Sequence, residues 1–165
     1  MHRRAAPLAA LLIAPAVIYS SAAAQSNTVI GAPNPLISDG ARAMEAGRFE
    51  EGMRLTLAGL ELPAPPADAA AAHSNLCAAY VYFKRYDEAL SHCNDALELD
   101  TTNWRTYNNR AAVFVGMKKF DLAMTDVNTG LTIAPNSATL LKSREVVSEH
   151  QAAYGHDRRR KPKKT

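Results

Sequence analysis

Two stretches of the chain that lie 34 residues apart decide the fold: residues 76–99, LCAAYVYFKRYDEALSHCNDALEL, and residues 110–133, RAAVFVGMKKFDLAMTDVNTGLTI. Small and apolar residues coincide when the first stretch is laid on the second. The coinciding pairs are Cys77 with Ala111, Tyr80 with Phe114, Tyr86 with Phe120, Ala89 with Ala123, Ala96 with Gly130 and Leu97 with Leu131. A fixed period of this length predicts a stack of repeated helical units.

A third copy of the pattern lies upstream at a shift of 37 residues. Phe49, Gly52, Gly59 and Leu60 fall on the positions of the first stretch, and the three extra residues fit the proline-rich segment 63–68. Glycine weakens a helix by about 1 kcal/mol relative to alanine. The first unit is therefore expected to be present but looser than the other two.

Each unit is predicted to contain two helices. In the middle unit, apolar residues at helical spacing indicate helices over about 69–83 and 86–99. Pro135 cannot continue a helix, and Asn136 or Ser137 can cap the next one, over about 138–153. The sequence thus predicts an all-α domain over 33–153, with units over about 33–69, 70–103 and 104–137 and a closing helix over 138–153.

This pattern resembles the tetratricopeptide repeat (TPR). The residues that carry the resemblance are Leu76, Tyr80, Tyr86, Ala89 and Ala96 in the second unit, and Ala111, Phe114, Phe120, Ala123, Gly130 and Pro135 in the third. The resemblance implies a short right-handed α-solenoid. It also implies a concave face, formed by the first helix of each unit, that binds an extended or helical peptide.

Six residues are candidates for that face by helical phase: Asn75, Tyr82, Arg105, Asn108, Asn109 and Lys142. Asparagine can both donate to and accept from a peptide backbone, and arginine can hold a carboxylate. The alternative interpretation is that these are ordinary solvated residues on a polar helix face.

A narrower resemblance concerns the carboxylate-clamp TPR domains, which grip the C-terminal peptide of cytosolic chaperones. Asn75 and Arg105 match two clamp positions. The other three positions hold Ile37, Ala41 and Asn109, none of which is the clamp residue. A complete clamp is therefore not expected.

No pattern in the chain is typical of catalysis or of a cofactor site. There is no glycine-rich phosphate loop, nucleophile elbow or paired-carboxylate site. His73, His92, His150 and His156 show no metal-ligand spacing with cysteine or carboxylates. We expect a protein that is not an enzyme and has no cofactor, no metal site and no small-molecule substrate.

Cys77 and Cys93 fall on the two antiparallel helices of the middle unit. Side chains lean toward the N-terminus of their own helix, so these two lean toward one another. A disulfide requires α-carbons within about 7 Å. The alternative is that both are small core residues, offset by about one helical turn. The sequence is compatible with both interpretations, a disulfide and two separate core cysteines.

The N-terminus has the pattern of a secretory signal peptide over residues 1–24, followed by a flexible linker over 25–32. A basic start at Arg3 and Arg4 precedes an apolar run, which ends in small residues at Ala22-Ala23-Ala24. A membrane anchor is disfavoured, because two prolines interrupt a run shorter than the ~20 residues of a spanning helix. The pair Arg3-Arg4 is also a feature of signals for the twin-arginine export route, but the residues that follow fit general secretion better. The mature protein is expected in the periplasm or outside the cell.

The C-terminal segment 154–165 is expected to be a disordered basic tail. Its basic residues are Arg158, Arg159, Arg160, Lys161, Lys163 and Lys164. Together with Asp157 they give a net charge of +5, against −4 for residues 25–155. The tail either aids solubility, folds back on the acidic body, or attaches to an anionic lipid surface, polymer or nucleic acid.

The sequence therefore predicts an exported protein-interaction module that binds an unidentified protein or peptide on its concave face. The alternative is an envelope-associated structural protein held to an anionic surface by its tail.

Overall fold

The computed structural model describes residues 34–160, with side chains described as far as Gly155. The predicted signal peptide and linker lie outside the described residues, as do Lys161, Lys163 and Lys164. The described part is all-helical. Its helices are α1 (Pro35–Glu45), α2 (Phe49–Leu60), α3 (Pro66–Tyr82), α4 (Tyr86–Leu99), α5 (Trp104–Gly116), α6 (Phe120–Ile133) and α7 (Ala138–Arg160).

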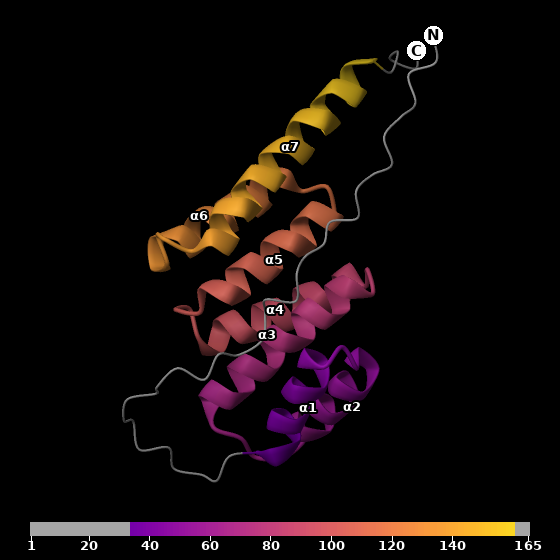
Figure 1. The fold of residues 1–165 in the computed structure, drawn as a ribbon, viewed down its shortest axis with the longest axis vertical. Coiled ribbons are helices and arrows are strands. Elements are labelled where there is room, and N and C mark those ends of the chain that lie inside the picture. The colour runs from indigo at the N-terminus through magenta and orange to yellow at the C-terminus, as the bar shows by residue number, and fades with distance from the viewer. Residues whose placement is uncertain (1–33, 161–165) are drawn as a thin grey trace.

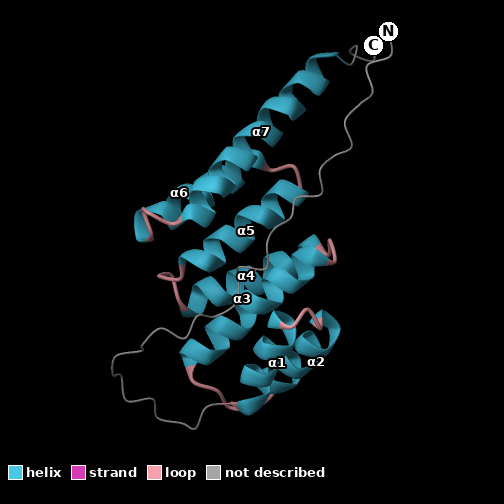
Figure 2. Cartoon of the chain, viewed as in Figure 1, coloured by secondary structure: helices cyan, strands magenta, loops and turns pink. Residues whose placement is uncertain are grey.

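The helices stack in chain order along the long axis of the molecule (Figure 1). Helices α1 with α2, α3 with α4, and α5 with α6 form antiparallel pairs joined by short connections (Figure 2). The first helices of the pairs contact one another, α1 against α3, α3 against α5, and α5 against the closing helix α7. This arrangement is the α-solenoid of three units and a closing helix that the sequence predicts.

The connection inside each unit repeats one backbone geometry. A single residue in the left-handed region ends each first helix, and the next residue donates its N–H to the carbonyl five positions earlier, which is the glycine-type helix cap. The left-handed residues are Gly47 (φ 77°), Lys84 (φ 58°) and Lys118 (φ 60°). The three hydrogen bonds run from Arg48 to Ala43, from Arg85 to Tyr80 and from Lys119 to Phe114. In the second and third units the cap carries two basic residues in succession, Lys84-Arg85 and Lys118-Lys119.

Helix starts follow local chemistry as well. The side chains of Asn34 and Asn103 accept from the N–H groups of Leu36 and Arg105, which caps α1 and α5. Helix α3 begins at Pro66, three residues before its predicted start, because proline suits the first turn of a helix. Helix α4 occupies the predicted range.

Cys77 and Cys93 are joined by a disulfide at the centre of the second unit. Their α-carbons lie 5.2 Å apart, so the offset of one turn that would have kept them separate is not present. Leu76 and Ala89 are completely buried beside the bridge. Of the two readings that the sequence left open, the structure has the bridged one.

The first unit is not loosely packed, contrary to the expectation from its glycines. A Cβ atom on Gly52 would lie 2.8 Å from the carbonyl oxygen of Gly40, and one on Gly40 would lie 2.8 Å from that of Gly52. A Cβ on Gly59 would lie 2.8 Å from Ile37. These glycines let α1 and α2 approach backbone to backbone, so their cost in helix propensity is offset by close packing.

One buried ion pair joins the helices of the third unit. Arg110 on α5 donates from Nε and Nη2 to the two carboxylate oxygens of Asp126 on α6, at 2.8 and 2.9 Å. A third bond runs from Arg110 to Asn94 on α4. Hydrogen bonding to Asp126 raises the pKa of Arg110 above its usual value, so the guanidinium stays charged. The bidentate geometry fixes the orientation of α5 against α6.

Helix α7 is longer than predicted, because it continues to Arg160. Residues 154–160, expected to belong to a disordered tail, are therefore helical in the structure. Arginine is a good helix former, and positive charge is favourable near a helix C-terminus, which explains why a basic segment extends the helix. Among the described helices, none combines the length and the apolar character that crossing a bilayer requires.

Candidate binding surface

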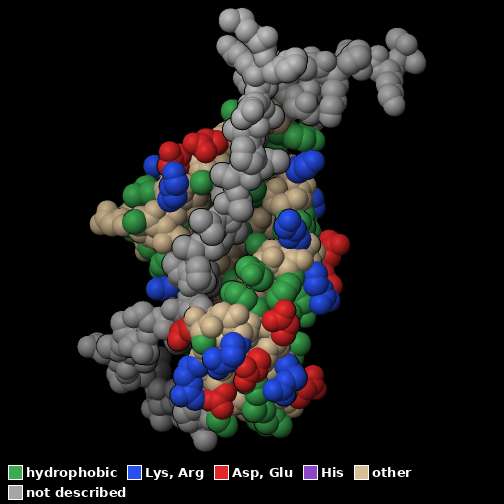
Figure 3. All heavy atoms as spheres, turned by 45° about the vertical axis from the view of Figure 1, so that its right-hand side comes forward, with side chains coloured by type: hydrophobic (Ala, Val, Ile, Leu, Met, Phe, Trp, Pro, Cys, Tyr) green, Lys and Arg blue, Asp and Glu red, His purple; other side chains and the backbone are tan. Residues whose placement is uncertain are grey.

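The first helices of the units, α1, α3 and α5, and the closing helix α7 form one layer of the molecule, with α4 and α6 behind it (Figure 1). We call the outer side of this layer the odd-helix face. It corresponds to the face that the sequence predicts to bind a peptide. In the view of Figure 3, side chains of both charge signs are interspersed over the described surface.

Arg105 lies in the first turn of α5, two residues after the cap Asn103. Its guanidinium stands 4.5 Å from the ring centroid of Trp104, in a cation–π contact. Its Nε is buried and has no hydrogen-bond partner in the described part of the chain. Because a guanidinium matches the geometry of a carboxylate, this half-buried arginine is the strongest candidate on the odd-helix face for contact with an acidic ligand.

Tyr82 is the most exposed large apolar residue of the described chain, at 64%. It ends α3, and its ring stacks on Phe49, the first residue of α2, with centroids 4.4 Å apart. Phe83 meets both rings edge to face. This aromatic cluster joins the first and second units and leaves much of the Tyr82 side chain exposed to solvent.

Lys142 lies exposed on α7 and forms an ion pair with Glu145 at 2.6 Å. Hydrogen bonding to Glu145 raises its pKa, so it is fully charged at neutral pH. As an exposed pair within one helix, this contact stabilises little and can be exchanged for a ligand.

Asn75, Asn108 and Asn109 are buried, although the sequence analysis expected them to be exposed. Each is 7% exposed or less. Asn109 donates from Nδ2 to the backbone oxygen of Ser74 at 3.2 Å, and Asn108 accepts from Ser143 at 2.7 Å. These amides therefore hold α5 against α3 and α7.

The error has a plain physical cause. Helical phase shows only that a residue points away from the second helix of its own unit. Such a residue can still be buried, because the first helices of neighbouring units pack side by side. Thr106 extends the same polar contact, donating to Ser74 Oγ at 3.0 Å. A signal was present in the sequence: Ser74 with Asn109, and Asn108 with Ser143, are both separated by 35 residues, close to the repeat period. Residues one period apart lie on neighbouring equivalent helices.

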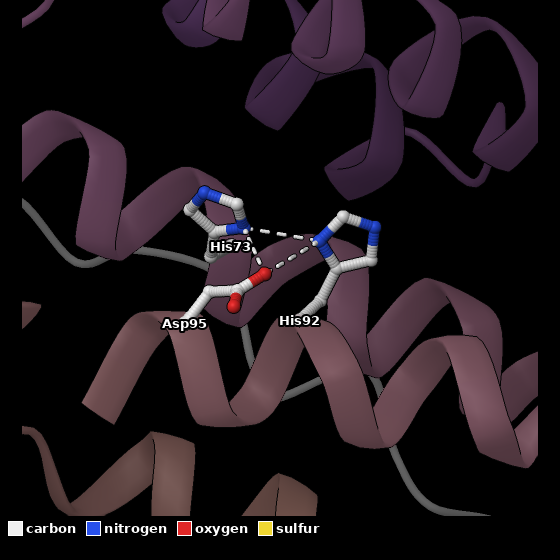
Figure 4. A group of neighbouring side chains, drawn as sticks. All are labelled: His73, His92 and Asp95. Carbon is white, nitrogen blue, oxygen red and sulfur yellow. Dashed lines mark hydrogen bonds and ion pairs between the residues drawn. The ribbon is translucent and has the colours of Figure 1, made fainter. Parts of the chain in front are cut away.

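The structure also brings together His73, His92 and Asp95, which linear spacing gave no reason to associate (Figure 4). His73 lies on α3, and the other two lie on α4. The prediction of no metal site considered only separations along the chain, which do not register side chains that helix packing brings together. Antiparallel packing of α3 on α4 closes a gap of 19 residues to a distance of 3.0 Å between the two Nδ1 atoms.

Comparison with known proteins bears on the fold. No protein-family model matches the chain, and no curated protein does. Among solved structures, the first TPR domain of human RPAP3 matches with a TM-score of 0.66 and 23% identity, over 73% of this chain and 93% of that one. The first TPR of Spaghetti (RPAP3), bound to the HSP90 peptide SRMEEVD, matches with a TM-score of 0.64 and 24% identity, over 72% and 91%.

A TPR-like protein of Chlorobium tepidum matches as well, with a TM-score of 0.61 and 18% identity, over 73% of this chain and 92% of that one. At these identities the likeness concerns the fold and not the ligand. The helix pairs, the repeated caps and the closing helix agree with it. The chain therefore has the tetratricopeptide-repeat fold.

Proposed function

We propose that this chain is a protein-interaction module, which binds an extended acidic segment of a partner protein on the odd-helix face. The observation that carries the proposal is Arg105, whose guanidinium is held over Trp104 and has no carboxylate partner within residues 34–155. A preformed surface lowers the ordering cost of binding a peptide. Two of the structural neighbours were solved with acidic peptides, SRMEEVD of HSP90 and SGPTIEEVD of HSP70, which is consistent with this mode.

The proposed ligand chemistry follows from what surrounds Arg105. A carboxylate of the partner pairs with the guanidinium of Arg105, and the exposed ring of Tyr82 supplies an apolar contact at the other end of the face. Lys142 adds a second exchangeable charge on α7. The two clamp positions of the first unit hold Ile37, which is buried, and Ala41. The chain therefore lacks the basic and amide groups that would complete a carboxylate clamp there. We therefore expect weaker selectivity for a free C-terminus.

We further propose that the protein acts after export. The basic, apolar and small-residue pattern of residues 1–24 supports this location. The disulfide between Cys77 and Cys93 supports it independently, because such bonds persist in oxidising compartments and are rare in the cytosol.

The test is a titration with a defined acidic peptide. Peptides selected from a random display library, together with SRMEEVD, are titrated calorimetrically against the oxidised protein. Arg105→Glu is expected to weaken the tightest acidic peptide by roughly tenfold or more, since a charge-assisted hydrogen bond is replaced by repulsion. The matched control is Arg54→Glu, an exposed arginine on α2.

The proposal fails if Arg105→Glu and Arg54→Glu change the affinity equally. If instead only removal of residues 156–165 abolishes binding, attachment through the basic tail is the better explanation.

A further inference from the structure

We propose that His73, His92 and Asp95 form a binding site for a divalent transition-metal ion, with Zn²⁺ as the best match. The site lies between α3 and α4, beside the disulfide, and uses none of the residues assigned to peptide binding. It therefore goes beyond the proposed function and stands independently of it.

The distances between the three ligand atoms are those of a metal site. The two Nδ1 atoms lie 3.0 Å apart, and Asp95 Oδ2 lies 3.5 Å from His73 Nδ1 and 3.9 Å from His92 Nδ1. The point equidistant from these three atoms lies about 2.0 Å from each, which matches Zn–N and Zn–O bond lengths of about 2.0–2.2 Å. Figure 4 shows the two Nδ1 atoms and the Asp95 oxygen converging on one another.

The donor set selects the class of ion. Imidazole nitrogen suits Zn²⁺, Cu²⁺ and Ni²⁺, whereas Mg²⁺ and Ca²⁺ require oxygen ligands throughout. Two histidines and one carboxylate also leave a fourth position of a tetrahedral ion for water or for a donor from another molecule. The side chains of His73 and His92 are 20% and 18% exposed and that of Asp95 is 43% exposed, so solvent reaches the site.

The surroundings hold the ligands in place before any ion binds. His73 and Cys77 are one turn apart on α3, and His92 precedes Cys93 on α4, so the disulfide fixes the two ligand-bearing segments at one separation. The His92 ring stacks on Tyr80, with centroids 5.3 Å apart and planes 8° from parallel. Such preorganisation reduces the entropy lost when the ion is bound.

The close approach of the two imidazoles favours one shared cation over two separate protons. Two Nδ1 atoms at 3.0 Å cannot both carry a proton without repulsion. A cation with vacant coordination positions satisfies both lone pairs and the carboxylate at once.

The experiment titrates ZnCl₂ into the untagged full chain by calorimetry, after confirming that no free thiol is present. Oxidised protein is required because reduced Cys77 and Cys93 would offer new ligands. We expect one saturable site per chain, a rise in melting temperature with Zn²⁺ and none with Mg²⁺. Co²⁺ bound at the same site should show the visible absorption bands of a low-coordinate, non-octahedral ion.

Three variants locate the site. His73→Gln, His92→Gln and Asp95→Asn are each expected to weaken Zn²⁺ binding by roughly tenfold or more. His150→Gln is the matched control, because His150 lies on α7 against Phe120 and outside the cluster. Asp95→Asn changes a partly exposed carboxylate and keeps its shape, so it tests the site even if a histidine variant unfolds.

Absence of saturable Zn²⁺ binding to the wild-type chain would overturn the proposal. So would equal affinity in the wild type and in Asp95→Asn and His92→Gln, since the ion would then lie elsewhere. In either case the two histidines are a hydrogen-bonded pair and no more.

Discussion

The two positions at which the paired helices of a unit meet hold different residues in each unit, and the contrast is sharpest between the first unit and the second. At the closest approach of the paired helices, the first unit has Gly40 and Thr56, and the second has Cys77 and Cys93. All four residues are buried. In the first unit a Cβ on Gly40 would lie 2.2 Å from Thr56 Oγ1, whereas in the second a covalent bridge spans the gap.

The third unit supplies a third solution, with Ala111 and Val127 at these positions. The comparison shows that the contact between the paired helices accepts one small and one medium-sized residue, or a disulfide of similar volume. The volume of the side chains matters there, and their identity does not. Exchanging these residue pairs between units therefore tests how each pair stabilises the fold.

The largest effect is expected at the neighbouring contact position, which holds Gly52, Ala89 and Ala123 in the three units. Ala89 is completely buried against α3. Ala89→Arg should lower the free energy of unfolding by about 4 kcal/mol, through overpacking and an unpaired buried charge. Denaturant unfolding measures the loss. The control Ser91→Arg places the same side chain at an exposed position of α4 and should cost less than about 0.5 kcal/mol. Equal stability of the two variants would refute the assigned helix contact.

The next effect concerns the bridge of the second unit. Replacing Cys77 by Ala and Cys93 by Val installs the pair that the third unit uses, so the core stays filled while the cross-link is lost. The double variant should unfold about 3 kcal/mol more easily than the oxidised wild type, because a loop of 16 residues is no longer closed in the unfolded chain. Urea unfolding with EDTA present measures the difference. If reduction of the wild type costs nothing, the bridge does not stabilise this unit.

The smallest effect concerns a hydroxyl. Thr56 Oγ1 is buried and has no hydrogen-bond partner in the described chain, and the third unit has Val127 at the equivalent position. Thr56→Val should raise the free energy of unfolding by about 1 kcal/mol, by removing an unsatisfied polar group of the same shape. The reciprocal Val127→Thr should lower it by about 1 to 2 kcal/mol. Two changes of the same sign, followed by thermal unfolding, would show that the positions are not equivalent.

Periodicity was enough to predict the units and the boundaries of α4, because apolar spacing reports on contacts within one chain segment. It could not give the burial of Asn75, Asn108 and Asn109, since that depends on how far neighbouring first helices overlap. The first unit was judged by helix propensity alone. Its glycines are instead explained by the close approach of α1 and α2, which becomes visible only when Gly40 and Gly52 are seen in contact.

One candidate site was predicted from the sequence, and the other was not. Arg105 and Tyr82 were predicted from helical phase. In the structure the Tyr82 side chain is largely exposed, and Arg105 has no carboxylate partner within residues 34–155. The cluster of His73, His92 and Asp95 was missed, because its members come from two helices and converge only through their packing. No spacing within one helix signals such a site, although His92 and Asp95 share one face of α4.

The most direct test of the proposed function is the map of backbone amide shifts when the tightest acidic peptide is titrated into the ¹⁵N-labelled, oxidised protein. Binding on the odd-helix face predicts that the perturbed amides cluster on α3, α5 and α7, around Arg105 and Tyr82, and leave α4 and α6 unchanged. Perturbations confined to α2, α4 and α6, or to the residues after Gly155, would contradict it.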